Sequence, residues 1–421
     1  MKPFTLMIAF SICSLVLTAG KTLKVDPPPP GHPLVLGEAA TFFWEFEIKH
    51  RGNEKPRLFQ ATMPSWMTFT YNDTTAAKGS HTYVLQGQAK PDALGDTPIS
   101  LVFTDPKGNP TTLSFVVRVV AAYTPGDFDG DGTADFSFRE GNSFYYLNRQ
   151  NEATYLFFDG MPANSVPLVG RFDHDNRADI AVWNPATGDW SIYTSMTGYS
   201  HPVQCQFGER GTDTPFVGDV DGDGLDDLII HRFVPSYDEK SRGVWFTRSL
   251  NNDSVDSLSF SGYDDDIPLV GDFNGNGTVD VAVKQLRNNR WTIHEFYGET
   301  QLARFPFSMQ DSDKIAPADY DGDGTTDIAI RRVTEEQLGA WIIRSRNGSL
   351  RLQNFATQPN DIEVPADYNG DGLADHAVYR PSTGEFMPMI REKVKVISVA
   401  PANADVVPLM AQSFFKRHYR R

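Results

Sequence analysis

Short apolar and aromatic runs, separated by clusters of glycine, proline and polar residues, mark the first part of the chain. Between residues 35 and 120 such runs occupy 41–48, 58–69, 81–86, 99–104 and 112–120, and the last two flank a turn-type cluster from Asp105 to Pro110. Several short strands without a helical period in fewer than about 100 residues are typical of a β-sandwich. The pattern predicts an all-β fold that begins with a sandwich over 35–120.

From residue 121 a second pattern appears as an internal repeat. Six copies read GDFDGDGTADFSF, GRFDHDNRADIAV, GDVDGDGLDDLII, GDFNGNGTVDVAV, ADYDGDGTTDIAI and ADYNGDGLADHAV. Position 1 of each loop is the second residue of the copy, and these residues are separated by 44, 48, 53, 47 and 48 positions. A period of about 48 residues fits propeller blades better than helical or leucine-rich solenoids.

Each unit reads as four antiparallel strands around the acidic loop. The third strand carries an aromatic residue that we expect to pack between neighbouring blades. These aromatic residues are Phe144, Trp190, Trp245, Trp291, Trp341 and Phe386. A seventh lead strand, Val406 to Ala411, has no acidic loop after it and is suited to complete a blade begun at the other end of the domain. The sequence therefore predicts a β-propeller over 121–421, with six blades favoured and seven as the alternative.

The acidic loops carry the clearest chemistry. In the first loop Asp127, Asp129, Asp131 and Asp135 occupy positions 1, 3, 5 and 9, and Gly132 occupies position 6. Such a spacing brings carboxylates together in an oxygen-only cage that suits Ca²⁺, and glycine permits the sharp turn. An EF-hand would need glutamate at position 12, where all six copies have an apolar residue. Dockerin modules are disfavoured because a strand, rather than a helix, follows each loop.

The succession of strand, acidic loop and strand, repeated about every 48 residues, resembles the FG-GAP/VCBS repeat family. That family includes the propeller of integrin α subunits. The segment 35–120 loosely resembles cadherin-like, immunoglobulin-fold modules of surface proteins. The first resemblance implies a propeller with Ca²⁺ in its loops, at about five sites. By loop position it implies these ligands: Asp127, Asp129, Asp131, Asp135; Asp173, Asp175, Asp179; Asp219, Asp221, Asp223, Asp227; Asp272, Asn274, Asn276, Asp280; Asp319, Asp321, Asp323, Asp327; and Asp367, Asn369, Asp371, Asp375.

The second loop departs most from the repeat. Arg171 replaces the acidic residue at position 1, and Asn176 replaces the glycine at position 6. Two outcomes are open for this loop: a retained site, or a salt bridge from Arg171 or Arg177 in place of the ion. The fourth loop has only two carboxylates, so we expect weaker binding there.

The net charge of the chain bears on its partners and on the predicted metal sites. The chain of 421 residues has 54 acidic and 38 basic residues, a net charge of −16, which argues against nucleic acid as a partner. Twenty of the acidic residues lie at loop positions 1, 3, 5 and 9. Most of the acidity is therefore assigned to the predicted metal sites.

The N-terminus and the cysteines indicate the compartment. Residues 1–20 read as a secretory signal peptide, with Lys2 before an apolar run and small residues at its end. Residues 21–34 read as a Pro-rich linker. Cleavage would leave Cys205 as the single cysteine, so no intrachain disulfide is available. No further apolar stretch of transmembrane length follows. We expect a secreted or cell-surface protein, with a periplasmic location also open.

The sequence favours a binding or adhesion protein for an extracellular protein or glycan over an enzyme. It has no nucleophile motif, phosphate loop or zinc-type His/Cys spacing. The alternative is a polysaccharide-active hydrolase or lyase with carboxylates from different blades. The longest insertion, Phe233 to Arg242, with Tyr237, Asp238 and Glu239, is the predicted specificity loop.

Overall fold

The protein is all-β in a computed structural model. The structure describes residues 23–26, 34–37, 41–50, 57–72, 80–88, 95–104, 109–120, 123–158, 161–162, 164–209, 213–234, 242–261, 265–297, 301–310, 312–333, 338–399 and 406–409. The predicted signal peptide and residues 235–241 of the predicted specificity loop lie outside these ranges. The chain divides into two compact units, with a boundary between Ala122 and Tyr123. No helix of the described part is long and apolar enough to cross a membrane.

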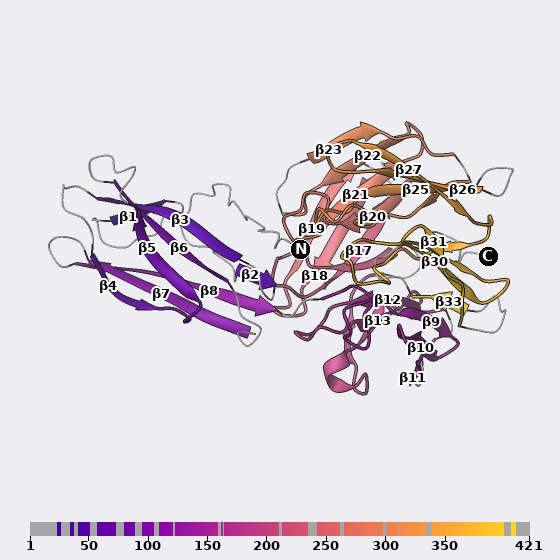
Figure 1. The fold of residues 1–421 in the computed structure, drawn as a ribbon, viewed down its shortest axis with the longest axis horizontal. Coiled ribbons are helices and arrows are strands. Elements are labelled where there is room, and N and C mark those ends of the chain that lie inside the picture. The colour runs from indigo at the N-terminus through magenta and orange to yellow at the C-terminus, as the bar shows by residue number, and fades with distance from the viewer. Residues whose placement is uncertain are drawn as a thin grey trace. The chain divides into compact units, whose positions relative to one another are not determined.

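The first unit is a sandwich of two four-stranded sheets (Figure 1). One sheet has the order β1 (Leu23–Asp26), β3 (Thr41–His50), β6 (Ser80–Gln88) and β5 (Met67–Asn72). The other has the order β2 (Leu34–Gly37), β8 (Pro110–Val120), β7 (Gly95–Thr104) and β4 (Arg57–Thr62). Strand β2 is parallel to β8, and the remaining pairs are antiparallel. With β1 and β2 counted as two parts of one first strand, the orders correspond to the A-B-E-D and G-F-C sheets of immunoglobulin-like domains.

The core of the sandwich comes from the inward faces of both sheets. Phe46 and Leu85 of one sheet and Leu101, Phe103 and Val117 of the other are at most 1% exposed. Alternate residues of a strand point to opposite faces, so each strand supplies this core with every second side chain.

Two predictions for this region are corrected. The predicted linker over 21–34 contains β1, which pairs with the edge of β3 from Leu23 to Asp26. The run 58–69, expected as one strand, is two strands in different sheets. Pro64 cannot donate a ladder hydrogen bond, and its carbonyl instead accepts one from the Met67 amide at 3.0 Å in the turn between β4 and β5.

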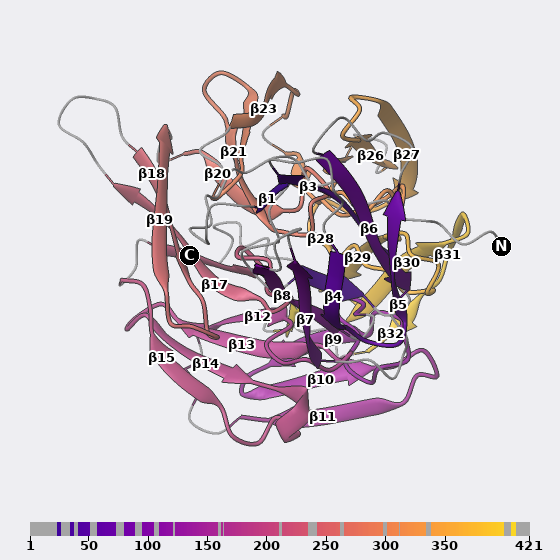
Figure 2. The same ribbon diagram turned by 90° about the vertical axis from the view of Figure 1, so that its left-hand side faces the viewer.

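The second unit contains six sheets, which follow one another around a common centre (Figure 2). In strand order they are as follows. The first has β11 (Ala153–Phe157), β10 (Ser143–Leu147), β9 (Phe136–Glu140) and β33 (Val406–Pro408); the second β12 (Val166–Gly170), β13 (Asp179–Asn184), β14 (Asp189–Tyr193) and β15 (Val203–Gln206); the third β16 (Asp213–Gly218), β17 (Asp227–Val234), β18 (Arg242–Arg248) and β19 (Val255–Ser261). The fourth has β20 (Ile267–Gly271), β21 (Asp280–Gln285), β22 (Arg290–His294) and β23 (Gln301–Pro306); the fifth β24 (Lys314–Ile315), β25 (Ile328–Val333), β26 (Leu338–Arg344) and β27 (Leu350–Ala356); the sixth β28 (Ile362–Glu363), β29 (His376–Arg380), β30 (Glu385–Ile390) and β31 (Lys393–Val394), with β32 (Ile397–Ser398) also on β30.

Consecutive sheets share hydrophobic cores, and the expected aromatic residues are central to them. Trp190 of the second sheet is fully buried with Leu228 and Ile230 of the third. The pattern repeats around the unit, and Phe386 of the sixth sheet lies against Phe136 of the first, with ring centroids 5.6 Å apart. The packing role expected for the third-strand aromatic residues is therefore confirmed.

The C-terminal strand β33 belongs to the first sheet. It pairs antiparallel with β9, so that Pro408 lies opposite Phe138, just as Pro167 of β12 lies opposite Val182 in the second sheet. Val406 and Leu409 are 2% and 6% exposed. The unpaired lead strand of the sequence thus completes the sheet that the N-terminal end of the unit begins.

Shortening the chain tests the role of β33. A chain that ends at Asp405 loses the buried side chains of Val406 and Leu409 and should be destabilised by at least about 3 kcal/mol relative to a control chain that ends at Leu409. Denaturant unfolding measures the difference. Equal unfolding midpoints for the two chains would contradict the role given to β33.

Candidate metal centres

Backbone hydrogen bonds join the six acidic loops, which lead into β9, β13, β17, β21, β25 and β29. The amide at position 8 of each loop donates to the carbonyl at position 1 of the preceding loop. The six donor–acceptor pairs are Ala178 to Asp127, Asp226 to Arg171, Val279 to Asp219, Thr326 to Asp272, Ala374 to Asp319 and Ala134 to Asp367, at 2.5–2.8 Å. The last bond returns to the first loop, so the series is closed. Each residue at position 1 is held by the loop that follows it.

Within a loop, backbone amides fix the carboxylate at position 1. Asp127 accepts hydrogen bonds from Gly130 at 2.6 Å and from Gly132 at 2.7 Å, one on each oxygen. Both glycines have positive φ, 82° and 85°. A Cβ at Gly132 would have nothing within 4 Å, so the backbone conformation, rather than space, requires glycine there.

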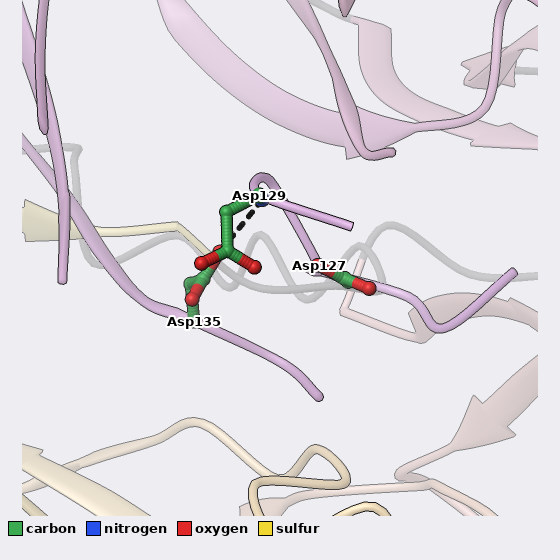
Figure 3. A group of neighbouring side chains, drawn as sticks. All are labelled: Asp127, Asp129 and Asp135. Atoms are coloured by element: carbon green, nitrogen blue, oxygen red, sulfur yellow. Dashed lines mark hydrogen bonds between the residues drawn. The ribbon is translucent and has the colours of Figure 1, made fainter. Parts of the chain in front are cut away.

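The carboxylate at position 9 is also buried, and only one of its two oxygens has a hydrogen-bond partner among the described residues. Asp135 Oδ2 accepts hydrogen bonds from the amides of Phe128 and Asp129 at 2.8 and 3.3 Å, the second of which is drawn in Figure 3. Asp135 Oδ1 is buried and has no hydrogen-bond partner among the described residues. Burial raises the pKa of Asp135 to about 8 and that of Asp127 to about 6. A cation between these carboxylates would satisfy the orphaned oxygen and stabilise the ionised forms.

Three loops bring the carboxylates of positions 1, 3 and 9 together. In each group, one oxygen per residue lies within 4.8 Å of the others. The groups are Asp127, Asp129 and Asp135; Asp219, Asp221 and Asp227; and Asp319, Asp321 and Asp327. Oxygen-only donor sets of this kind fit a hard cation such as Ca²⁺. These are the three loops with the most carboxylates in the sequence.

The predicted ligands at position 5 lie outside these groups. Asp131 Oδ1 accepts hydrogen bonds from the amide and the hydroxyl of Thr133, at 2.9 and 2.6 Å. Asp323 accepts the same pair from Thr325. Asp223 likewise is not a member of the group in its loop. The position-5 carboxylate therefore stabilises the turn through one of its oxygens.

The fourth and sixth loops have asparagine at position 3. The Asn274 amide donates to Asp280 at 3.1 Å, and the Asn369 amide donates to both oxygens of Asp375 at 3.0 Å. The carboxylates at position 1, Asp272 and Asp367, are fixed by loop amides as in the first loop. In this form the side-chain NH₂ group donates to the carboxylate at position 9, and the asparagine oxygen would have to turn inward to bind an ion. The predicted ligands Asn276 and Asp371 at position 5 each accept a hydrogen bond from the amide at position 7.

The second loop provides protein hydrogen-bond donors for its acidic side chains. A short 3-10 helix, η2 (Ser195–Thr197), donates its first two amides to Asp179 at 2.7 Å and to Asp173 at 3.0 Å. The Ser195 hydroxyl donates to Asp175 at 2.7 Å. All three acidic residues predicted as ligands in this loop therefore have donors from one segment.

The guanidinium of Arg171 contacts the backbone of its own loop and an aromatic ring. It donates to the backbone carbonyl of Asp175 at 3.2 Å and lies 5.3 Å from the ring centre of Tyr123. At positions 4 and 6, His174 and Asn176 have no positive φ, in contrast to the glycines of the other loops. The missing glycines were the sequence signal that this loop has another backbone path, whereas the donors from η2 had no recognisable motif.

Sequence reasoning missed three ion pairs in which a half-buried arginine meets a buried aspartate. Arg232, Arg332 and Arg380, in β17, β25 and β29, make two hydrogen bonds each to Asp213, Asp313 and Asp361, respectively. The common spacing of 19 residues between Asp and Arg was the available signal. The same aspartates also accept a backbone amide in the preceding turn.

Substitution at position 3 should change the stabilisation by Ca²⁺ in the first loop but not in the second. Asp129→Ala removes a group member of the first loop and should lower the gain in unfolding free energy on adding Ca²⁺ by about 1–3 kcal/mol, one site's share at saturating ion. Asp173→Ala removes the acceptor for Met196 and should destabilise the protein equally with and without Ca²⁺. Thermal melts with Ca²⁺ and with chelator measure both. An unchanged Ca²⁺ response in Asp129→Ala would refute the first site.

The pKa shifts predict the pH dependence of the Ca²⁺ effect. In the folded form without an ion, burial raises the pKa of Asp135 to about 8. Protonated Asp135 therefore favours the folded form at low pH, and this contribution to stability is lost as the pH rises through about 8. Burial lowers the pKa of His231 and His376 to about 4, so neither titrates in the folded form near neutral pH. The Ca²⁺-induced rise in Tm should therefore be larger at about pH 8.5 than at about pH 6.5. A rise that shrinks toward alkaline pH would contradict this assignment.

Comparison with known protein families and with curated proteins finds no match. Among solved structures, the GspB Siglec domain matches 33% of this chain and 94% of its own length, with 12% sequence identity and a TM-score of 0.21. A TM-score of that size carries no argument about fold or function.

Proposed function

We propose that the protein is an extracellular binding module whose six-sheet unit is stabilised by Ca²⁺ and which attaches to a protein or glycan. The observation that carries the proposal is the recurrence of three aspartate groups at the same loop positions of a closed ring, with a buried carboxylate oxygen at Asp135 that has no other partner among the described residues. The resemblance of the repeat to FG-GAP/VCBS propellers supports the adhesive role.

Within this proposal, the ion would be held by positions 1, 3 and 9 of the first, third and fifth loops. Bound Ca²⁺ would supply positive charge that allows these carboxylates to remain ionised together. The chain itself positions them: glycines at positions 4 and 6 curl the loop, and the bonds between loops fix position 1. Fixed loops would give a ligand-binding surface a single conformation, which lowers the cost of ordering on binding.

Stability and binding can be measured in the same samples. Extracellular sites bind Ca²⁺ with a Kd of about 10⁻⁴ to 10⁻³ M, so saturating millimolar Ca²⁺ should add about 1–3 kcal/mol per site and raise Tm by several degrees. Binding to a glycan array or to an extracellular protein mixture should weaken when Ca²⁺ is chelated. A Tm that does not respond to chelation would refute the stabilising role, and turnover of a polysaccharide by the purified protein would refute the assignment as a non-catalytic module.

A further inference from the structure

A cavity of about 500 Å³ lies against the second sheet of the six-sheet unit. Met161, Pro162 and Ser165, from the segment that precedes β12, line one part of it, and β13, β14 and β15 line the rest. Sites for small molecules typically enclose about 300–1,000 Å³. The cavity is therefore large enough for a ligand of that class.

The strand register explains the lining of the cavity. Two neighbouring rows cross the sheet: Asn184, Asp189 and Gln206 form one, and Val182, Ser191 and Gln204 form the other. Residues two apart on a strand share a face, so both rows lie on the same side of the sheet. Five of these six side chains are polar, and all six residues line the cavity.

A small residue contributes to the space. Ser191 follows the buried aromatic residue of its strand, and the corresponding position holds Tyr145, Phe246, Ile342 or Met387 in four of the other sheets and Thr292 in the fourth sheet. Serine at this point leaves a volume that a larger side chain would take up.

The Ser165 hydroxyl is a second, independent indication of a ligand. Ser165 is 5% exposed, lines the cavity, and its Oγ has no hydrogen-bond partner in the described part of the chain. The fold uses only its backbone: the amide donates to Pro162 at 3.0 Å, and the carbonyl accepts from Arg139 at 2.5 Å. Buried hydroxyl groups in proteins are normally paired, so an unpaired one at a cavity indicates a bound partner.

The lining specifies the ligand's chemistry. The amides of Asn184, Gln204 and Gln206 and the serine hydroxyls can donate and accept hydrogen bonds, as sugar hydroxyls can. Asn184 Oδ1 already accepts from the Ala186 amide and Gln206 Nε2 already donates to the Gly208 carbonyl, which leaves the Asn184 NH₂ group and the Gln206 oxygen for a ligand. Among the described lining residues there is no lysine or arginine, and Asp189 is the one charged residue. Such a lining disfavours phosphates, sulfates and uronic acids. Met161 and Val182 offer apolar surface for the C–H face of a ring.

We propose that this cavity binds one neutral sugar residue of a glycan. This inference rests on the proposed binding function and gives it a site and a ligand class. The sugar would lie on the two polar rows of the second sheet, with one hydroxyl paired to Ser165.

The test is binding of methyl glycosides of neutral hexoses and N-acetylhexosamines, by saturation-transfer NMR and calorimetry. At least one glycoside should bind, whereas the methyl glycoside of a uronic acid should not. Ser191→Phe, which introduces the residue of the third sheet, should abolish binding. Ser165→Ala and Gln204→Ala should each weaken it about tenfold, the effect of losing one hydrogen bond to the ligand. Gln301→Ala, at an exposed glutamine on β23, is the matched control and should bind normally.

The Ca²⁺ response of Tm, measured on every variant, separates this proposal from the function on which it rests. If the response is intact and no glycoside binds, or if Ser191→Phe binds as the unmodified protein does, the sugar site is refuted while the Ca²⁺ role stands. If the response is absent in the unmodified protein, the Ca²⁺ role fails whatever the glycosides do.

Discussion

The closed series of backbone hydrogen bonds between loops is the constraint on which the six-sheet unit depends. Each bond uses the carbonyl of position 1 and the amide of position 8, so it places both ends of the acidic loop relative to the next sheet. The side chain of the same position 1 is a group member in the first, third and fifth loops. The same nine-residue loop therefore both joins neighbouring sheets and brings the carboxylates together.

The six loops share this backbone connection but differ in what their acidic side chains contact. In the first, third and fifth loops, the carboxylates of positions 1, 3 and 9 converge closely enough to hold one cation. In the fourth and sixth, an asparagine side chain donates to the buried carboxylate. In the second, the amides of η2 and the Ser195 hydroxyl take the acidic side chains. The backbone connection is thus common to all six loops, while the partners of the carboxylates differ. The stabilisation of the unit by Ca²⁺ should therefore come from the first, third and fifth loops.

Much of this organisation was predictable because it repeats. Six copies of one loop predict six sheets, and the lead strand at Val406 predicts how the first sheet is completed. Features supplied once by distant segments were not predictable: Ser195 reaches Asp179 across 16 residues, and nothing in the sequence marks it as a donor. Part of the assumed linker became β1 because the edge of β3 offers unpaired backbone groups, which a hydrophobicity pattern does not reveal.

The most direct measurement of the central claim is anomalous X-ray diffraction from crystals in which a lanthanide replaces Ca²⁺. Anomalous peaks are expected in the first, third and fifth loops, between positions 1, 3 and 9, and none is expected in the second loop, where donors from η2 already hold the acidic side chains. Absence of peaks from the first, third and fifth loops at saturating lanthanide, or a peak among Asp173, Asp175 and Asp179, would contradict it.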